Sequence, residues 1–248
     1  MRQVGLNVPF TKTMKILIGV NVAIWLFGQV IAEGYLGIPV THHLALYPGK
    51  VIYDGAIWQL ATYMFLHTMT VSHILLNMLM LWFMGAELET RWGSRFFTFY
   101  YLTTGIGAGL LYTLGVWVYF LFKGADVVLK VPVVGASGAI FGLMLAYGIL
   151  FGERVIHFMM LFPMKAKYFV MILGVVEVMS VLTNGVGSGE VANLAHIGGL
   201  ASGYLTLLGA TSWQRRSWKR KSAKKKGPNL RLVVDNDKTD EKEPRYWN

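Results

Sequence analysis

The sequence contains no cysteine, which excludes a disulfide framework, a thiolate metal site and a cysteine nucleophile. Charged residues are also scarce, because they make up 15% of the 248 residues, whereas a soluble domain usually carries about 25%. Hydrophobic residues account for 54% of the chain and fall in long runs with few charges. Such runs are typical of membrane helices. We therefore expect an all-α membrane protein.

Six apolar stretches predict a bundle of six transmembrane helices within residues 16–211. They cover residues 16–32, 72–86, 96–122, 134–152, 168–182 and 191–210. Several are shorter than the roughly 20 residues that usually cross a bilayer, which a helix packed inside a bundle tolerates. The first stretch follows Lys12 and Lys15 but has no clear cleavage site for a signal peptide, so we expect a retained helix. The long apolar loop 33–71 is expected to lie on the bundle, partly in the membrane interface.

The distribution of positive charge predicts the orientation of these helices. If both termini face the cytoplasm, only three of the 23 lysine and arginine residues fall in outer loops, namely Lys50, Lys123 and Lys130. Positive residues concentrate on the cytoplasmic side of membrane proteins. We therefore expect residues 1–15 to be a cytoplasmic N-terminal segment and residues 212–248 to be a basic, disordered cytoplasmic tail. The expected location is the cell membrane, plasma or inner.

The tail begins with a dense basic cluster over residues 215–226, directly after the last apolar stretch. A cluster at this place is typical of a segment that binds anionic lipid headgroups. Nucleic-acid binding is less favoured, because Trp213 and Trp218 fit a membrane interface equally well. The predicted partners of the chain are therefore lipids and not nucleic acids.

Polar residues on three predicted helices converge at one depth. With both termini inside, the second, fourth and sixth helices all descend from the outer surface. His73 and Asn77 lie in the first turns of the second helix, Ser137 in the first turn of the fourth, and His196 in the second turn of the sixth. A serine hydroxyl becomes nucleophilic when a base takes its proton, and His196 is the natural base. His73 and Asn77 share one helix face at i and i+4 and offer donors for an oxyanion.

Glycines flank both of the predicted reactive side chains, at Gly135, Gly138, Gly199 and Gly203. The pair Gly199 and Gly203 forms a G-x-x-x-G pattern, which allows close helix contact in lipid. A hydrogen bond between the serine and the histidine requires such contact. No acidic third member is evident, because nothing in the spacing of Asp126 or Glu190 places them there. A Ser–His dyad is the economical interpretation.

These motifs resemble the rhomboid family of intramembrane serine proteases. The matching segments are Gly135-Ala136-Ser137-Gly138, His73-Ile74-Leu75-Leu76-Asn77, Ala195-His196-Ile197-Gly198-Gly199 with Gly203, and Gly85-Ala86-Glu87-Leu88-Glu89 with Arg91 and Gly93. The resemblance covers roughly residues 14–211. It implies a six-helix core and cleavage of transmembrane protein substrates without a cofactor or a metal. By this resemblance Ser137 is the nucleophile, His196 the base, and His73 and Asn77 line the oxyanion site.

Two positions depart from the family pattern. The first outer loop has Trp58-Gln59 where the family often has Trp-Arg, which puts a loop contact in doubt. Phe141 stands where a tyrosine often stacks near the base. Stacking on His196 is compatible with phenylalanine, whereas a role for a hydroxyl is not.

Other interpretations remain open at this stage. One is a rhomboid-like protein that binds client helices without cleaving them, against which the presence of both Ser137 and His196 argues. Another is a small transporter, favoured only if Glu177 and the histidines line one path. Glu177 itself fits a satisfied polar residue better than a gate or a pH-sensitive group. His67 is interpreted as a brace for the outer loop rather than as a metal ligand with His42 and His43.

Overall fold

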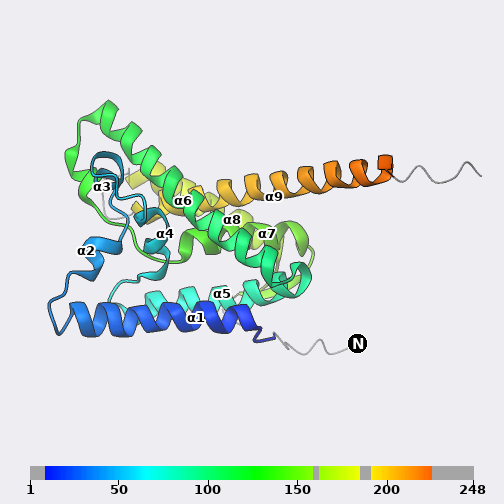
Figure 1. Ribbon diagram of the computed structural model, residues 1–248, viewed down its shortest axis with the longest axis horizontal. Helices are drawn as coiled ribbons and strands as arrows, with labels where there is room; N and C mark the ends of the chain where they lie inside the picture. Colours follow the sequence, from blue (N-terminus) through cyan, green and yellow to red (C-terminus); the bar gives the residue numbers. More distant parts are fainter. Residues whose placement is uncertain (1–8, 159–161, 185–190, 225–248) are drawn as a thin grey trace, which may run out of the picture. The chain divides into compact units, whose positions relative to one another are not determined.

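Helices form nearly all of the regular structure in the computed structural model, which describes residues 9–158, 162–184 and 191–224 (Figure 1). The chain divides into two units, residues 1–209 and 210–248, and the fold described below is that of the first unit. In chain order the elements are α1 (Lys12–Ala23), η1 (Ile24–Glu33), α2 (Val40–Leu44), α3 (Pro48–Tyr53), α4 (Gln59–Thr62), η2 (Tyr63–Phe65), α5 (Val71–Trp92), α6 (Ser94–Lys123), η3 (Asp126–Lys130), α7 (Ser137–Leu150), β1 (Val155–Phe158), β2 (Phe162–Lys165), α8 (Ala166–Asn184) and α9 (Val191–Lys224).

Four helical segments are long and apolar enough to cross a membrane. Among the described residues they are Lys12–Glu33, Val71–Trp92, Ser94–Lys123 and Ala166–Thr183. They correspond to the first, second, third and fifth predicted spans. The fourth predicted span contains α7, a shorter apolar helix of 14 residues, which corrects the predicted range of 134–152. The protein is therefore a mostly helical integral membrane protein.

The first predicted span begins earlier than expected and is not a uniform α-helix. Its α-helical part, α1, continues without a break into the ten-residue π-helix η1. The two elements together reach from Lys12 to Glu33, and α1 lies alongside α5 (Figure 1). A π-helix is rare, so the apolar run predicted a helix without predicting its winding.

The helix α5 extends past the predicted end of the second span and includes two acidic residues near its C-terminal end. Glu87 accepts a hydrogen bond of 3.0 Å from the Tyr147 hydroxyl, and Glu89 accepts one of 2.6 Å from the Ser94 hydroxyl. The buried Glu89 and the partly buried Glu87 are tolerated because such donors satisfy their carboxylates. The helix ends at Gly93, whose φ of 78° favours glycine and turns the chain into α6.

The helix α9 also runs further than the predicted sixth span, because its backbone is helical to Lys224. The prediction of a disordered tail over residues 212–248 is therefore wrong for residues 212–224. Residues 225–248 lie outside the described part of the chain. Among the described helices, α9 is not one of the four long apolar segments.

The long loop over residues 33–71 packs on the bundle, as its apolar composition predicts. It contains α2, α3, α4 and η2, and both α3 and α4 contact α6. Leu46 and Val133 exchange two backbone hydrogen bonds of 3.0 and 2.9 Å. The N–H of Gly135 donates to the carbonyl of Tyr63 at 3.0 Å. The loop thereby fixes the backbone that leads into α7.

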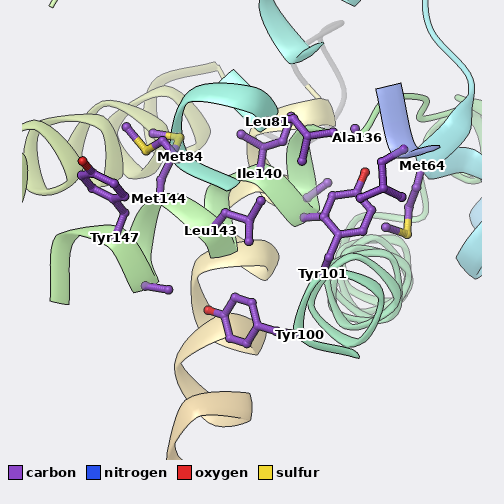
Figure 2. Close-up of a cluster of buried hydrophobic side chains, with 14 of the residues drawn as sticks. Met64, Leu81, Met84, Tyr100, Tyr101, Ala136, Ile140, Leu143, Met144 and Tyr147 are labelled. Atoms are coloured by element: carbon purple, nitrogen blue, oxygen red, sulfur yellow. The ribbon is translucent and has the colours of Figure 1, made fainter. Parts of the chain in front are cut away.

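The core is centred on α7, which packs against α5, α6 and α8. Figure 2 shows Leu81 and Met84 of α5 beside Ile140, Leu143 and Met144 of α7. All five side chains are buried. The helix that begins with the predicted nucleophile is therefore enclosed by other helices over most of its length.

Candidate active site

Ser137 and His196 are in direct contact. Ser137 is the first residue of α7, and His196 lies in the second turn of α9. The Nε2 atom of His196 is 2.8 Å from the Oγ atom of Ser137. A serine hydroxyl beside an imidazole nitrogen has a base in place to take its proton. The ring of Phe141 stacks on that of His196 at 4.2 Å and 12°, so phenylalanine supplies the stacking at this position.

The contact depends on the close approach of α7 and α9. A methyl group built at Gly199 would overlap the carbonyl oxygen of Gly138, and one at Gly203 would lie 3.0 Å from the Cα atom of Gly142. Small residues at spacings of four allow helix backbones to come this close. The G-x-x-x-G pattern therefore has the packing role that the sequence predicts for it.

His73 faces the same space as Ser137, and a hydrogen bond on the other side of its ring fixes its orientation. Its Nδ1 atom accepts a hydrogen bond of 3.2 Å from the backbone N–H of Thr68, which assigns the ring proton to Nε2. A methyl group built at Gly135 would lie 3.3 Å from His73 Nε2 and 3.6 Å from Ser137 Oγ. Gly135 has a φ of 125°, which favours glycine. The Nε2–H donor and the serine oxygen therefore face a common space.

The loop before α5 is clamped by Gln29 of η1. The Gln29 side chain donates to the carbonyl of His67 at 2.6 Å and accepts from its N–H at 2.8 Å. The His67 ring is fully buried and lies 5.3 Å from the His73 ring. Burial, with the neighbouring His73 as a smaller cause, lowers the pKa of His67 to about 4. The loop is therefore held through the backbone of His67, while its buried ring packs beside that of His73.

Asn77 lies one turn below His73 on α5 and is also buried. Its Nδ2 atom donates a hydrogen bond of 2.8 Å to the carbonyl oxygen of His73. An amide nitrogen carries two hydrogens, so this bond leaves the second one for another acceptor.

A cavity of about 570 Å³ brings these four side chains together. His73, Asn77, Ser137 and His196 all line it. Its other lining residues are mainly apolar and include Leu76, Met80, Ile140, Met144, Phe169 and Leu173. An apolar cavity with a few convergent polar groups is the usual form of a binding site.

Glu177 of α8 reaches the histidine, a contact that the sequence analysis missed. Its Oε1 atom lies 3.1 Å from His196 Nδ1. The Nδ1 atom makes no hydrogen bond of correct angle, so the contact is one of charge rather than an aligned hydrogen bond. Depth along the helices was the available signal, because Glu177 lies about two turns before the C-terminal end of α8 and His196 lies in the second turn of α9.

Two other sequence-based questions concern the loop over residues 33–71. The buried Gln59 accepts from the Tyr47 N–H at 3.0 Å and donates to the His43 carbonyl at 3.2 Å, so a loop contact is kept without the arginine. Within the described ranges, no group of three histidine or acidic side chains is placed to hold a metal ion.

Comparison with known proteins assigns the family. A model of the rhomboid domain matches residues 54–213, more than half of the chain. The chain is 33% identical to RHOMBOID-like protein 1 of Arabidopsis thaliana over 162 residues, which are 65% of this chain and 36% of that protein. It is 29% identical to the rhomboid protease GluP of Bacillus subtilis over 160 residues, 62% of this chain and 26% of that protein.

A third relative is the rhomboid protease GlpG of Yersinia pseudotuberculosis, 28% identical over 152 residues that make up 60% of this chain and 46% of that protein. The matched segment thus spans less than half the length of each of these three relatives. The domain match, supported by the apolar helices, shows that this chain belongs to the rhomboid family of integral membrane proteins.

Proposed function

We propose that this protein is an intramembrane serine endopeptidase that cleaves transmembrane protein substrates near the outer face of the membrane. The observation that carries the proposal is the 2.8 Å contact between His196 Nε2 and Ser137 Oγ, in a cavity that His73 and Asn77 also line. Two of the related proteins are named rhomboid proteases, which supports the same activity.

The proposed reaction starts with the Ser137 hydroxyl. Its proton moves to His196 Nε2 while Oγ forms a bond to the substrate carbonyl carbon, and the carbonyl electron pair moves onto the oxygen. The proton then passes to the leaving amine as the carbon–nitrogen bond breaks. Water, deprotonated by the same imidazole, releases the acyl group from the serine. A Ser–His pair of this kind needs no cofactor.

The developing oxyanion requires donors that already point at it. His73 Nε2–H and the free amide hydrogen of Asn77 are suited to this role, because both side chains line the cavity with Ser137. The first N–H groups of α7 add further donors, since the first turn of a helix has no intrahelical partners for them. Loss of one such donor typically reduces the rate on the order of 10²–10³-fold.

The membrane arrangement that we propose keeps the six predicted spans. The short α7 serves as the fourth span because neighbouring helices surround it, and the outer part of α9 serves as the sixth. Both termini face the cytoplasm, according to the charge distribution. The basic segment over residues 215–226 binds anionic lipid headgroups and not nucleic acid.

Substrates with helix-breaking residues should be preferred. An intact transmembrane helix satisfies its own backbone groups and shields its peptide bonds, so a segment must unwind before Ser137 reaches a carbonyl. We expect a model substrate that contains glycine near the outer face to be cleaved faster than a poly-leucine segment of equal length. Equal rates for the two would contradict this preference.

The proposal is tested with Ser137→Ala in liposomes. The wild type should cleave a model membrane substrate, and the variant should show no cleavage above background. Ser72→Ala removes an exposed serine from the first turn of α5 and should keep full activity. Cleavage that persists in Ser137→Ala rules out Ser137 as the nucleophile and overturns the proposed reaction. Absence of cleavage by the wild type rules out the protease function and favours a protein that binds client helices without cleaving them.

A further inference from the structure

Glu177 places a negative charge on the far side of His196 from the serine. Its Oε1 atom is 3.1 Å from Nδ1, whereas Ser137 Oγ is 2.8 Å from Nε2. The imidazole ring therefore lies between the serine oxygen and a carboxylate. Both side chains of the charged contact are largely buried, at 12% exposure for Glu177 and 15% for His196.

The surroundings of Glu177 make this contact more than incidental. The nearby side chains of α8 are apolar and exposed, among them Val175, Val176 and Met179. An ionisable residue in an apolar span is costly unless it is paired. Among the described residues, the second carboxylate oxygen, Oε2, has no hydrogen-bond partner. The contact with His196 is therefore the interaction that compensates this buried acid.

The other elements around the histidine bring no second carboxylate among the described residues. From α5 the titratable group is His73, with His67 behind it, and from α7 the facing groups are Ser137 and the uncharged Phe141. The α6 segment beside Gly198 has no charged residue over positions 96–122, and the α9 residues that flank His196 are uncharged.

We propose that Glu177 is a positioning residue that completes a Ser137–His196–Glu177 arrangement, a proposal that rests on the proposed protease function. Its charge favours the proton of the neutral ring on Nδ1, which leaves Nε2 free to accept the serine proton. After that transfer both nitrogens carry a proton, and the positive ring lies beside the carboxylate. The imidazolium then returns its Nε2 proton to the leaving amine.

The first test is Glu177→Gln, which removes the charge and keeps the shape. We expect kcat to fall on the order of 10²-fold, by analogy with the larger loss of about 10⁴-fold that follows loss of the acid in hydrogen-bonded triads. KM should change little, because Glu177 does not line the cavity. The acid limb of the pH profile should move to lower pH, because the variant removes a neighbouring negative charge that favours the protonated, inactive ring.

Ser180→Ala is the matched control on the same helix. Ser180 Oγ accepts a hydrogen bond of 2.5 Å from Asn193 Nδ2, so its loss alters the contact of α8 with α9 without changing charge at His196. We expect the acid limb of this variant at the wild-type pH. Equal shifts in Ser180→Ala and Glu177→Gln would show that the effect is structural and would overturn the proposal.

Glu177→Asp keeps the charge on a shorter side chain and supplies a second variant should the glutamine form fail to fold. It should lose roughly tenfold in kcat, one decade of the triad loss, and keep its acid limb near that of the wild type. An unchanged kcat in either Glu177 variant contradicts the proposal. If the wild type cleaves in a Ser137-dependent manner while Glu177→Gln behaves identically, the positioning role alone is wrong. If the wild type shows no Ser137-dependent activity, the protease function fails as well.

Discussion

The helices α7 and α8 both reach the candidate active site, but they are held very differently. Along α7 the side chains from Ala139 to Tyr147 are mostly buried. Beyond the first turn of α8, by contrast, large apolar side chains are exposed, including Met171 at 63% and Val175 at 61%. Ser137 therefore begins a helix fixed on all sides, whereas Glu177 is carried by a helix that presents much of its surface to lipid. The geometry of the serine is set by packing, and that of the acid by one charged contact.

The largest effect is expected where α7 meets α9. In Gly199→Val the new side chain would overlap the Gly138 carbonyl, which separates Ser137 from His196. Overpacking of this severity should cost more than about 3 kcal/mol, with loss of both activity and thermal stability. Gly209→Val on the same helix is the control, because a methyl group there meets nothing within 4 Å. Both variants are compared by substrate cleavage and by melting in detergent, and equal behaviour would contradict the packing account.

A pair of truncations compares the two helices directly. Leu143→Ala removes a fully buried side chain from α7 and should lower the free energy of unfolding by about 2–5 kcal/mol. Ile172→Ala removes a side chain that is 52% exposed on α8 and should cost about 0.5 kcal/mol. Unfolding of the purified variants in mixed micelles measures both values. Losses of similar size would mean that α8 is held as firmly as α7.

A smaller, pH-dependent effect is expected at the loop that orients His73. The pKa of His67 is about 4 in the folded protein and about 6.5 in an unfolded chain. The unfolded state therefore binds more protons between these values, and stability falls as the pH drops from 6.5 towards 4. His67→Phe should remove roughly 2 kcal/mol of this loss at pH 4.5. The melting temperature is followed against pH, with His43→Phe as the exposed control, and parallel curves would contradict the assignment.

The sequence was sufficient for the part of the site that depends on helix order. Charge bias and span order predict one depth for Ser137, His73 and His196, and the glycine spacing predicts the approach of α7 and α9. These arguments use properties of whole helices, which a single sequence displays well.

Features that depend on rotation about a helix axis were not predictable. The predicted depths put Glu177 and His196 at a similar level, but only the packed structure shows that the Glu177 carboxylate faces the His196 ring. The end of α5 was missed for a related reason. In the sequence, the two carboxylates Glu87 and Glu89 suggest that the span ends before them. The structure shows their hydrogen-bond donors, which are Tyr147, distant in the sequence, and Ser94, just beyond the helix.

The central claim is that His196 activates Ser137, and the most direct measurement is the rate at which a fluorophosphonate labels the folded protein, with the modified residue mapped by mass spectrometry. We predict a single adduct on Ser137 in the wild type and none in Ser137→Ala. In His196→Ala the rate should fall by on the order of 10³-fold or more. Labelling of Ser137 at an undiminished rate in a folded His196→Ala variant would contradict the account.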